Sequence, residues 1–155
     1  MGIIKKIAVG SVLAFGIYSF RKYKRTISAI NGLKLSIDKI HDVKIDWNSI
    51  QLQIDLKLSN PTTIGLGVTT LGLVKIKQIQ FYSKASGKLI GTANVTLSNI
   101  NIKPKNHKVI KNIPAIIPVS SAINNIDLFL GKGKDTLSVI LIIESFGKQI
   151  TLNTN

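Results

Sequence analysis

The strongest constraint on the fold is a strict alternation of apolar and polar residues from Ile50 to Leu58. Every second residue of this segment is Ile or Leu, and every residue between them is polar. Because successive side chains of a β-strand point to opposite faces, the pattern predicts an antiparallel strand with one face on a core and the other in water. The strand should end at Asn60-Pro61, since proline cannot donate a hydrogen bond to the ladder.

Six other segments show strand patterns, separated by turn residues such as Ser86-Gly87. Changes in the phase of alternation predict a bulge near Lys77 and another inside the first segment. Two prolines make 109–119 an edge strand or a bulged one, and 120–130 has the pattern of a short helix. The six segments are 33–45, 71–82, 88–102, 109–119, 137–143 and 149–152.

The length of 155 residues leaves room for one such core. We therefore expect an all-β fold, a small antiparallel β-sandwich of about seven strands with one short helix. An N-terminal hydrophobic helix should precede it. The expected division is 1–25 for that helix with its basic collar and 26–155 for the sandwich. Trp47, just ahead of the long strand, is expected to pack at the edge of the core.

The N-terminal region contains a run from Ile7 to Phe20 with no charged residue. As a helix the run would be about 21 Å long at ~1.5 Å per residue, whereas a hydrocarbon core is ~30 Å thick. If Lys5, Lys6 and Arg21 reach toward the headgroups, the run approaches a minimal span. A membrane anchor is expected, with a core helix and a cleaved signal peptide as alternatives. The expected anchor residues are Ile7, Val9, Val12, Leu13, Phe15, Ile17 and Phe20.

Basic residues outnumber acidic residues by 21 to 7, which gives a formal net charge of +14. Four of them directly follow the apolar run, a position suited to anionic lipid, and four lysines surround Pro104 in what should be one loop. A solvated surface and the lysine-rich codon usage of an AT-rich genome are the alternatives. The expected contacts with anionic lipid or a partner are Arg21, Lys22, Lys24, Arg25, Lys103, Lys105, Lys108 and Lys111.

No catalytic or metal-binding pattern stands out. The chain has no Cys, which excludes disulfides, thiolate metal sites and a cysteine nucleophile. The two histidines lack ligand spacing, and Asp38, Asp42 and Asp46 do not converge if their segment is a strand. The stretch 131–136 lacks the Walker spacing of a phosphate loop. We therefore expect neither an enzyme nor a bound cofactor or metal.

The segment Leu52–Thr62 (LQIDLKLSNPT) resembles the late-embryogenesis-abundant type 2 domain, also called the water-stress and hypersensitive-response domain. In that family a long alternating strand ends in Asn-Pro. A glycine-containing hairpin at Ser86–Gly91, a proline-bearing apolar stretch at Ile113–Val119, a short helix and a final strand follow in the same order. The resemblance covers roughly Leu33 to Leu152. It implies a small antiparallel sandwich without enzyme activity, and a short hydrophobic N-terminal anchor is common in the family.

Together these features predict a non-catalytic, membrane-anchored β-sandwich protein with a structural or binding role in a larger assembly. One alternative is a structural protein of a virus or phage particle that links an internal membrane to the shell. Another is a basic nucleic-acid-binding domain, although no groove-reading helix or stacking platform is evident. The expected localisation is at a membrane through a single N-terminal anchor, or inside a virus particle. The expected partners are membrane lipid and other proteins of the assembly, and nucleic acid is the less favoured partner.

Overall fold

The computed structural model describes residues 2–66, 74–98, 100–122, 124, 129 and 133–154, with 2–16 described by their backbone. A long helix is followed by seven strands, which confirms the predicted all-β fold with its N-terminal helix. The helices are α1 (Gly2–Asn31), α2 (Val119–Ala122) and α4 (Gly133–Thr136). The strands are β1 (Lys34–Ile45), β2 (Ser49–Asn60), β3 (Val74–Ser83), β4 (Leu89–Leu97), β5 (Asn106–Pro118), β6 (Leu137–Ser145) and β7 (Lys148–Asn153).

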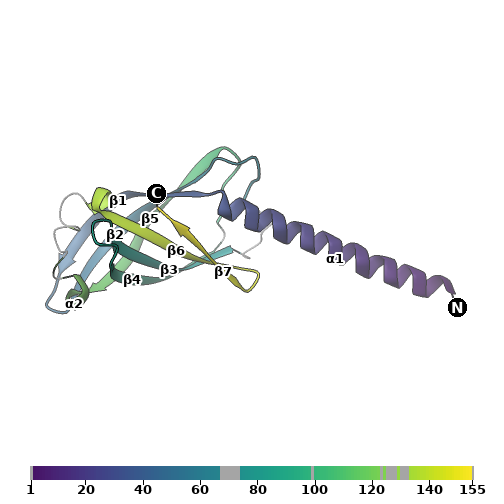
Figure 1. Cartoon of the computed structure of the whole chain (residues 1–155), viewed down its shortest axis with the longest axis horizontal. Helices are drawn as coiled ribbons and strands as arrows, with labels where there is room; N and C mark the ends of the chain where they lie inside the picture. The colour runs from purple at the N-terminus through teal and green to yellow at the C-terminus, as the bar shows by residue number, and fades with distance from the viewer. Residues whose placement is uncertain are drawn as a thin grey trace.

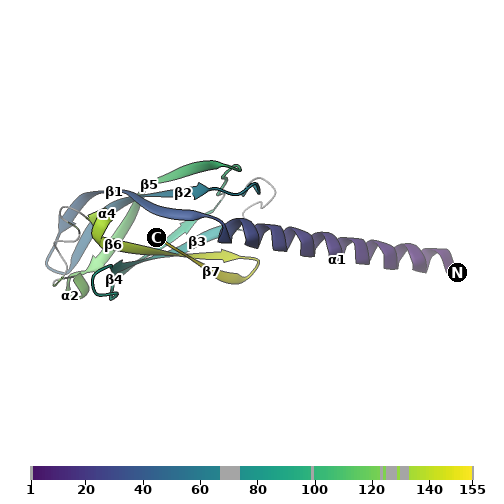
Figure 2. The same ribbon diagram turned by 45° about the horizontal axis from the view of Figure 1, so that its top comes forward.

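The strands form two antiparallel sheets packed face to face, as Figure 2 shows. One sheet has the order β1-β2-β5 and the other the order β4-β3-β6-β7. The Ile and Leu residues of β2 face the second sheet, and Leu56 and Leu58 are fully buried. The alternation from Ile50 to Leu58 therefore marks the core face, as the sequence predicts. Strand β6 is central, between β3 and β7, and it contributes four buried apolar side chains, Leu137, Val139, Leu141 and Ile143.

The predicted irregularities are present in the strands. The register of β3 against both of its neighbours shifts between Ile76 and Gln78, next to the predicted bulge at Lys77. Strand β1 shifts twice against β2, between Ile37 and Lys39 and between His41 and Lys44. Strand β5 lies at the edge of its sheet and is also bulged, in agreement with its two prolines. The predicted helix at 120–130 begins as α2, and most of it lies outside the described residues.

The prediction for Trp47 is wrong, because its side chain is 96% exposed. The residue lies in the turn between β1 and β2, which is closed by a 2.8 Å hydrogen bond from Asp46 N–H to the Ser49 carbonyl. The turn places the indole in solvent instead of against the core.

Helix α1 projects from the sandwich along the long axis of the molecule (Figure 1). The predicted localisation at a membrane through a single N-terminal anchor is wrong: the described part of the chain has no helix long and apolar enough to cross a bilayer. The apolar run between Lys6 and Arg21 is too short for the ~30 Å hydrocarbon core. Two of the predicted anchor residues, Ile17 and Phe20, have described side chains, and these are 56% and 57% exposed.

Candidate functional site

The last two turns of α1 attach the helix to the sandwich. Ala29 and Ile30 are buried in the core, and Thr26 is only 5% exposed. The chain leaves the helix through Gly32, whose N–H donates to the Ser28 carbonyl at 3.1 Å. Helix α1 is continuous across position 25, where the sequence placed the boundary between the helix and the sandwich. The sandwich thus holds one end of α1 and leaves residues 17–21 exposed.

A second contact braces the helix from the side of β6 and β7. The ring of Tyr23 lies edge-on to the ring of Phe146, with centroids 5.4 Å apart and an interplanar angle of 79°. Phe146 occupies the turn between these strands with a φ of 52°, beside Gly147 with a φ of 71°. The Lys148 ammonium lies 5.5 Å from the Tyr23 centroid, at a distance suited to a cation–π contact. Aromatic packing therefore fixes the direction in which α1 projects.

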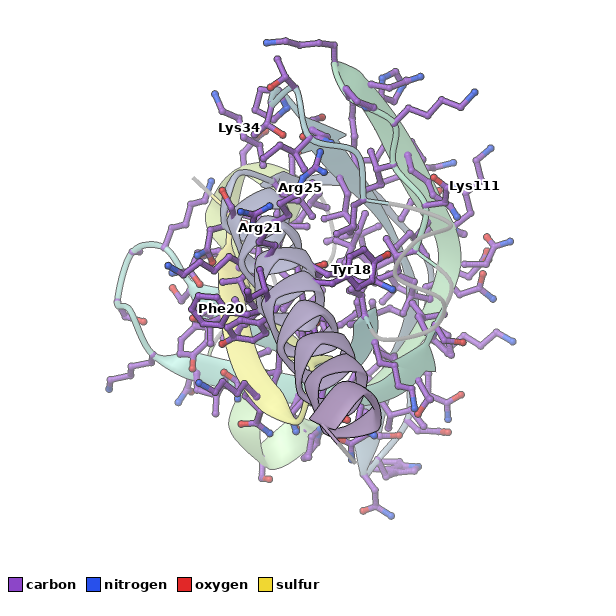
Figure 3. All side chains as sticks on the ribbon, turned by 90° about the vertical axis from the view of Figure 1, so that its right-hand side faces the viewer. Tyr18, Phe20, Arg21, Arg25, Lys34 and Lys111 are labelled. Atoms are coloured by element: carbon purple, nitrogen blue, oxygen red, sulfur yellow. The ribbon has the colours of Figure 1, made fainter. Side chains whose placement is uncertain are left out.

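Three of the four predicted collar residues line one groove. Its volume is about 370 Å³, and it lies between α1 and the loop that follows β2. The helix contributes residues at the i, i+3, i+4, i+7 and i+8 positions of one face, and the loop contributes Ile64 and Gly65. Figure 3, which looks along α1, shows Tyr18 and Phe20 on opposite sides of the helix. The helix residues that line the groove are Tyr18, Arg21, Lys22, Arg25 and Thr26.

The fourth collar residue, Lys24, does not line this groove. Its Nζ lies 4.8 Å from the centroid of the Phe20 ring, on the other side of the helix. The sequence grouped all four residues as one contact surface, but the 100° rotation per helical residue separates them. The structure therefore divides the collar into a groove-lining set and one lysine held by an aromatic ring.

The cations of the groove have no carboxylate partner in the described part of the chain. The ion pairs there are Lys77 with Glu144 at 3.9 Å and His41 with Asp42 and Asp55. Six of the seven acidic residues of the chain are described, and none contacts Arg21, Lys22 or Arg25. A concave surface is thus lined by basic residues without a described acidic partner, which favours an anionic ligand.

The loop side of the groove is held by the side chain of Asn60, which is 1% exposed. Its amide group donates to the Ile64 carbonyl at 2.8 Å, and its carbonyl oxygen accepts from Thr62 N–H at 3.1 Å and Thr62 Oγ1 at 2.7 Å. Asn60 belongs to the Asn-Pro pair at the predicted end of the long strand. The buried amide thus shapes the loop that carries Ile64 and Gly65.

The predicted cluster around Pro104 does not form a single loop. Lys103 and Lys105 flank the turn before β5, whereas Lys108 and Lys111 are part of β5 itself. All four side chains are exposed. An open groove of about 320 Å³ beside this turn is lined by Lys57, Ser59, Asn60, Pro61, Lys105, Asn106 and His107. Contact of these lysines, or of the collar, with an anionic lipid or partner stays a prediction.

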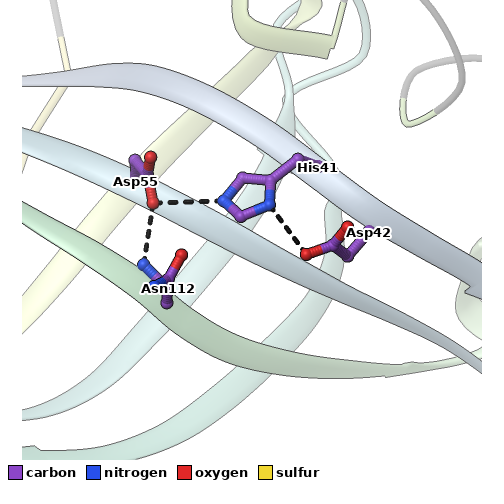
Figure 4. A network of polar contacts seen from close by, with 4 residues as sticks. All are labelled: His41, Asp42, Asp55 and Asn112. Atoms are coloured by element: carbon purple, nitrogen blue, oxygen red, sulfur yellow. Dashed lines mark hydrogen bonds and ion pairs between the residues drawn. The ribbon is translucent and has the colours of Figure 1, made fainter.

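A polar network crosses the middle of the β1-β2-β5 sheet (Figure 4). Asp55 Oδ1 accepts a 2.7 Å hydrogen bond from the backbone N–H of Asn112, and His41 Nε2 lies 3.2 Å from the same oxygen. His41 Nδ1 lies 3.0 Å from Asp42 Oδ2. The hydrogen bonds to Asp55 and Asp42 raise the pKa of His41, and the Asn112 N–H lowers the pKa of Asp55.

The network contains one His and two Asp side chains, but they are not grouped as metal ligands. In residues 2–66, 74–98, 100–122, 124, 129 and 133–154, no three His, Asp or Glu side chains are grouped so that they could hold a metal ion. The bulges of β1 and β5 place Asp42 and Asn112 at φ values of 53° and 55°, a conformation that Asp and Asn tolerate better than most residues. The network therefore joins the three strands at their irregular positions.

Sequence reasoning missed three components of the groove, which are Tyr18, Thr26 and the Ile64–Gly65 loop. Thr26 carries no charge and belongs to no motif, so no signal in the sequence distinguishes it. The helical spacing of Tyr18, Lys22 and Arg25 was a usable signal, since residues separated by three or four positions share a helix face. The Ile64–Gly65 loop lines the groove only because the packing of the core fixes where α1 ends.

No family model matches this chain, and no curated protein matches it. Among solved structures, a solution structure from Arabidopsis thaliana is similar, with 19% identity and a TM-score of 0.46 over 77% of this chain and 75% of that chain. A crystal structure from Archaeoglobus fulgidus has 9% identity and a TM-score of 0.41 over 76% of this chain and 90% of that chain.

A third neighbour is a solution structure described as a late embryogenesis abundant (LEA) protein. It has 15% identity and a TM-score of 0.39, and the match covers 98% of this chain and 83% of that chain. A late embryogenesis abundant protein is thus among the structural neighbours, in agreement with the resemblance predicted from the sequence. With identities and TM-scores this low, the neighbours say nothing about what the chain binds.

Proposed function

We propose that this chain is a non-catalytic binding protein of a larger assembly, and that α1 is the element by which it docks to a partner protein. The observation that carries the proposal is the exposure of Ile17 and Phe20, at 56% and 57%, on a helix whose last turns are buried in the core. These two residues are three positions apart and therefore share one side of α1. An apolar helix face held away from its own domain is suited to a groove on another protein.

The partner that fits this face has an apolar groove bordered by carboxylates. The α1 segment up to Arg25 contains six basic residues and no acidic one. Two copies of α1 packed together would bring like charges into contact, which disfavours self-association through the helix. A groove with an acidic border instead supplies opposite charge to the same residues. Charge complementarity thus favours an acidic partner over a second copy of this chain.

A model acceptor with this chemistry is calcium-loaded calmodulin, whose apolar groove binds basic amphipathic helices. Full-length chain should bind it, and the variant Ile17→Ser/Phe20→Ser should bind at least about tenfold more weakly. Burying a large apolar side chain contributes about 1.5–3 kcal/mol to the binding free energy. Removing two such side chains should therefore lower the affinity by more than about tenfold. The matched control is Leu89→Ser, because Leu89 is a large apolar residue that is 49% exposed but lies on β4, away from α1. The affinity of this variant for calmodulin should equal that of the unchanged chain.

Two results would contradict the proposal. One is equal binding of calmodulin by the full-length chain and by the Ile17→Ser/Phe20→Ser variant. The other is a dimer in sedimentation experiments that the same variant dissociates, because a second copy would then be the occupant of the apolar face. Calmodulin without calcium is acidic but has no open groove, so its weaker binding separates apolar docking from charge attraction.

A further inference from the structure

We infer that the groove between α1 and the Ile64–Gly65 loop is a binding site for a small anion that carries more than one phosphate group. Three basic residues of one helix face line it, namely Arg21, Lys22 and Arg25. Guanidinium groups bind phosphate oxygens in a bidentate manner, and an ammonium adds a point charge. Because no described carboxylate neutralises these cations, the free groove holds a net positive charge.

A polar side chain of the helix lies beside the three basic residues. Thr26 is 5% exposed and lines the groove, so its hydroxyl belongs to the wall of the proposed site. A phosphate oxygen in the groove would accept from this hydroxyl. The groove thus offers a neutral donor next to its three cations.

The size and lining of the groove favour a small molecule. Its volume of about 370 Å³ lies at the low end of the range for ligand pockets, about 300–1,000 Å³. Tyr18 and Ile64 add an aromatic ring and an apolar side chain at the border of the charged part. This lining suits a phosphate ester whose organic group contacts Tyr18 while its phosphates contact the arginines. Tyr18 is on the side of α1 opposite Phe20, as Figure 3 shows. Neither Ile17 nor Phe20 lines the groove, although Arg21 borders the apolar docking face.

The test is calorimetric titration of the full-length chain with inorganic tripolyphosphate and, in a second arm, with ATP without magnesium. We expect one binding site for each. The variant Arg21→Gln/Arg25→Gln should bind both probes at least tenfold more weakly. The matched control is Lys24→Gln/Lys148→Gln, which removes the same charge from two residues that contact aromatic rings and do not line the groove. Its affinity should change less than twofold.

Two further variants define the contacts. Thr26→Val keeps the shape of the buried side chain and removes its hydroxyl. It should lower the affinity for tripolyphosphate several-fold, while the circular dichroism spectrum stays unchanged. Tyr18→Ala should lower the affinity for ATP and leave the affinity for tripolyphosphate unchanged. The variant Ile17→Ser/Phe20→Ser should bind both probes normally, which separates this site from the proposed docking function.

Three results would overturn the inference. An equal loss of affinity in Arg21→Gln/Arg25→Gln and in the charge-matched control would mean that the probes bind only through the overall positive charge. A full-length chain that binds neither probe has no such site. Tight binding of a single-stranded oligonucleotide that tripolyphosphate does not displace would assign the cations to a nucleic-acid backbone instead.

Discussion

His41 Nε2 and Asp55 Oδ1 lie 3.2 Å apart, although 14 positions separate the two residues in the sequence. The pairing of β1 with β2 brings them together across the sheet, and the bulges of β1 and β5 bring Asp42 and Asn112 to the same place. Lys111 adds a further favourable charge near Asp55. The network is therefore an electrostatic connection among three strands.

The first prediction concerns pH. Hydrogen bonds to Asp55 and Asp42 raise the pKa of His41 above its ordinary value of 6.5, so the protonated imidazole is favoured in the folded state. Its contribution to stability is then complete below about pH 6.5 and is lost as the pH rises through the folded pKa. The thermal midpoint of the wild-type chain should fall over that interval, and that of His41→Asn should change less.

The control for this prediction is His107→Asn, because His107 is exposed and lies outside the network. It should keep the wild-type pH dependence. At the acidic end, the Asn112 N–H lowers the pKa of Asp55 below its ordinary value of 3.8, so the contribution of Asp55 is lost only as the pH falls through that lower value. A His41→Asn variant with the same pH profile as the wild type above pH 6.5 would contradict the assignment.

The second prediction concerns the register of β2. Leu56 is fully buried and Lys57, the next residue, is on the outer face. Leu56→Asp places an unpaired carboxylate in the core, which costs several kcal/mol of the ~5–15 kcal/mol that stabilise a domain. Lys57→Asp should be nearly silent. Urea denaturation of both variants measures the difference, and equal midpoints would mean that the two faces are assigned wrongly.

The third prediction concerns a close contact between the two sheets, at Gly91 of β4 and Ile117 of β5. A Cβ at position 91 would lie 2.5 Å from Ile117 Cγ2, so Gly91→Ala forces the sheets apart or displaces the isoleucine. Overpacking of this kind costs about 1–3 kcal/mol of unfolding free energy. The neighbouring control Thr92→Ala should have a small effect, since Thr92 faces outward. Unchanged stability of Gly91→Ala in denaturant would show that β4 and β5 are farther apart.

The fourth prediction concerns Asn60. Its side chain satisfies the Ile64 carbonyl and two Thr62 donors, so Asn60→Ala leaves buried polar groups unpaired. Such a loss costs about 1–3 kcal/mol. The comparison is Asn94→Ala, because Asn94 makes an exposed 3.0 Å hydrogen bond with Gln78. Thermal unfolding should place Asn60→Ala well below Asn94→Ala, and the reverse order would exclude a structural role for the Asn60 amide.

The sequence was most informative where residue spacing reports on local geometry. The period of two in β2 predicts its buried face because neighbouring strand residues point to opposite sides. The same argument locates the bulge near Lys77, where the phase of alternation changes. Other predictions did not rest on this spacing and are wrong. An aromatic residue beside a strand does not reveal whether its side chain reaches the core, as Trp47 shows. The apolar run 7–20 approaches the length of a membrane span only if Lys5, Lys6 and Arg21 are added to it.

The sequence by itself determined the two-sheet fold, the strand faces and the charge of α1, because these depend on side-chain periodicity and composition. Only the tertiary structure decided which basic residues line a groove. The core holds Ala29 and Ile30 and thereby sets the rotation of α1, so that Arg21, Lys22 and Arg25 line one groove with Gly65, whereas the contact of Lys24 with Phe20 follows from the helix alone. Residues far apart in the chain, such as Thr26 and Ile64, line one groove because the packing of the whole domain positions both segments.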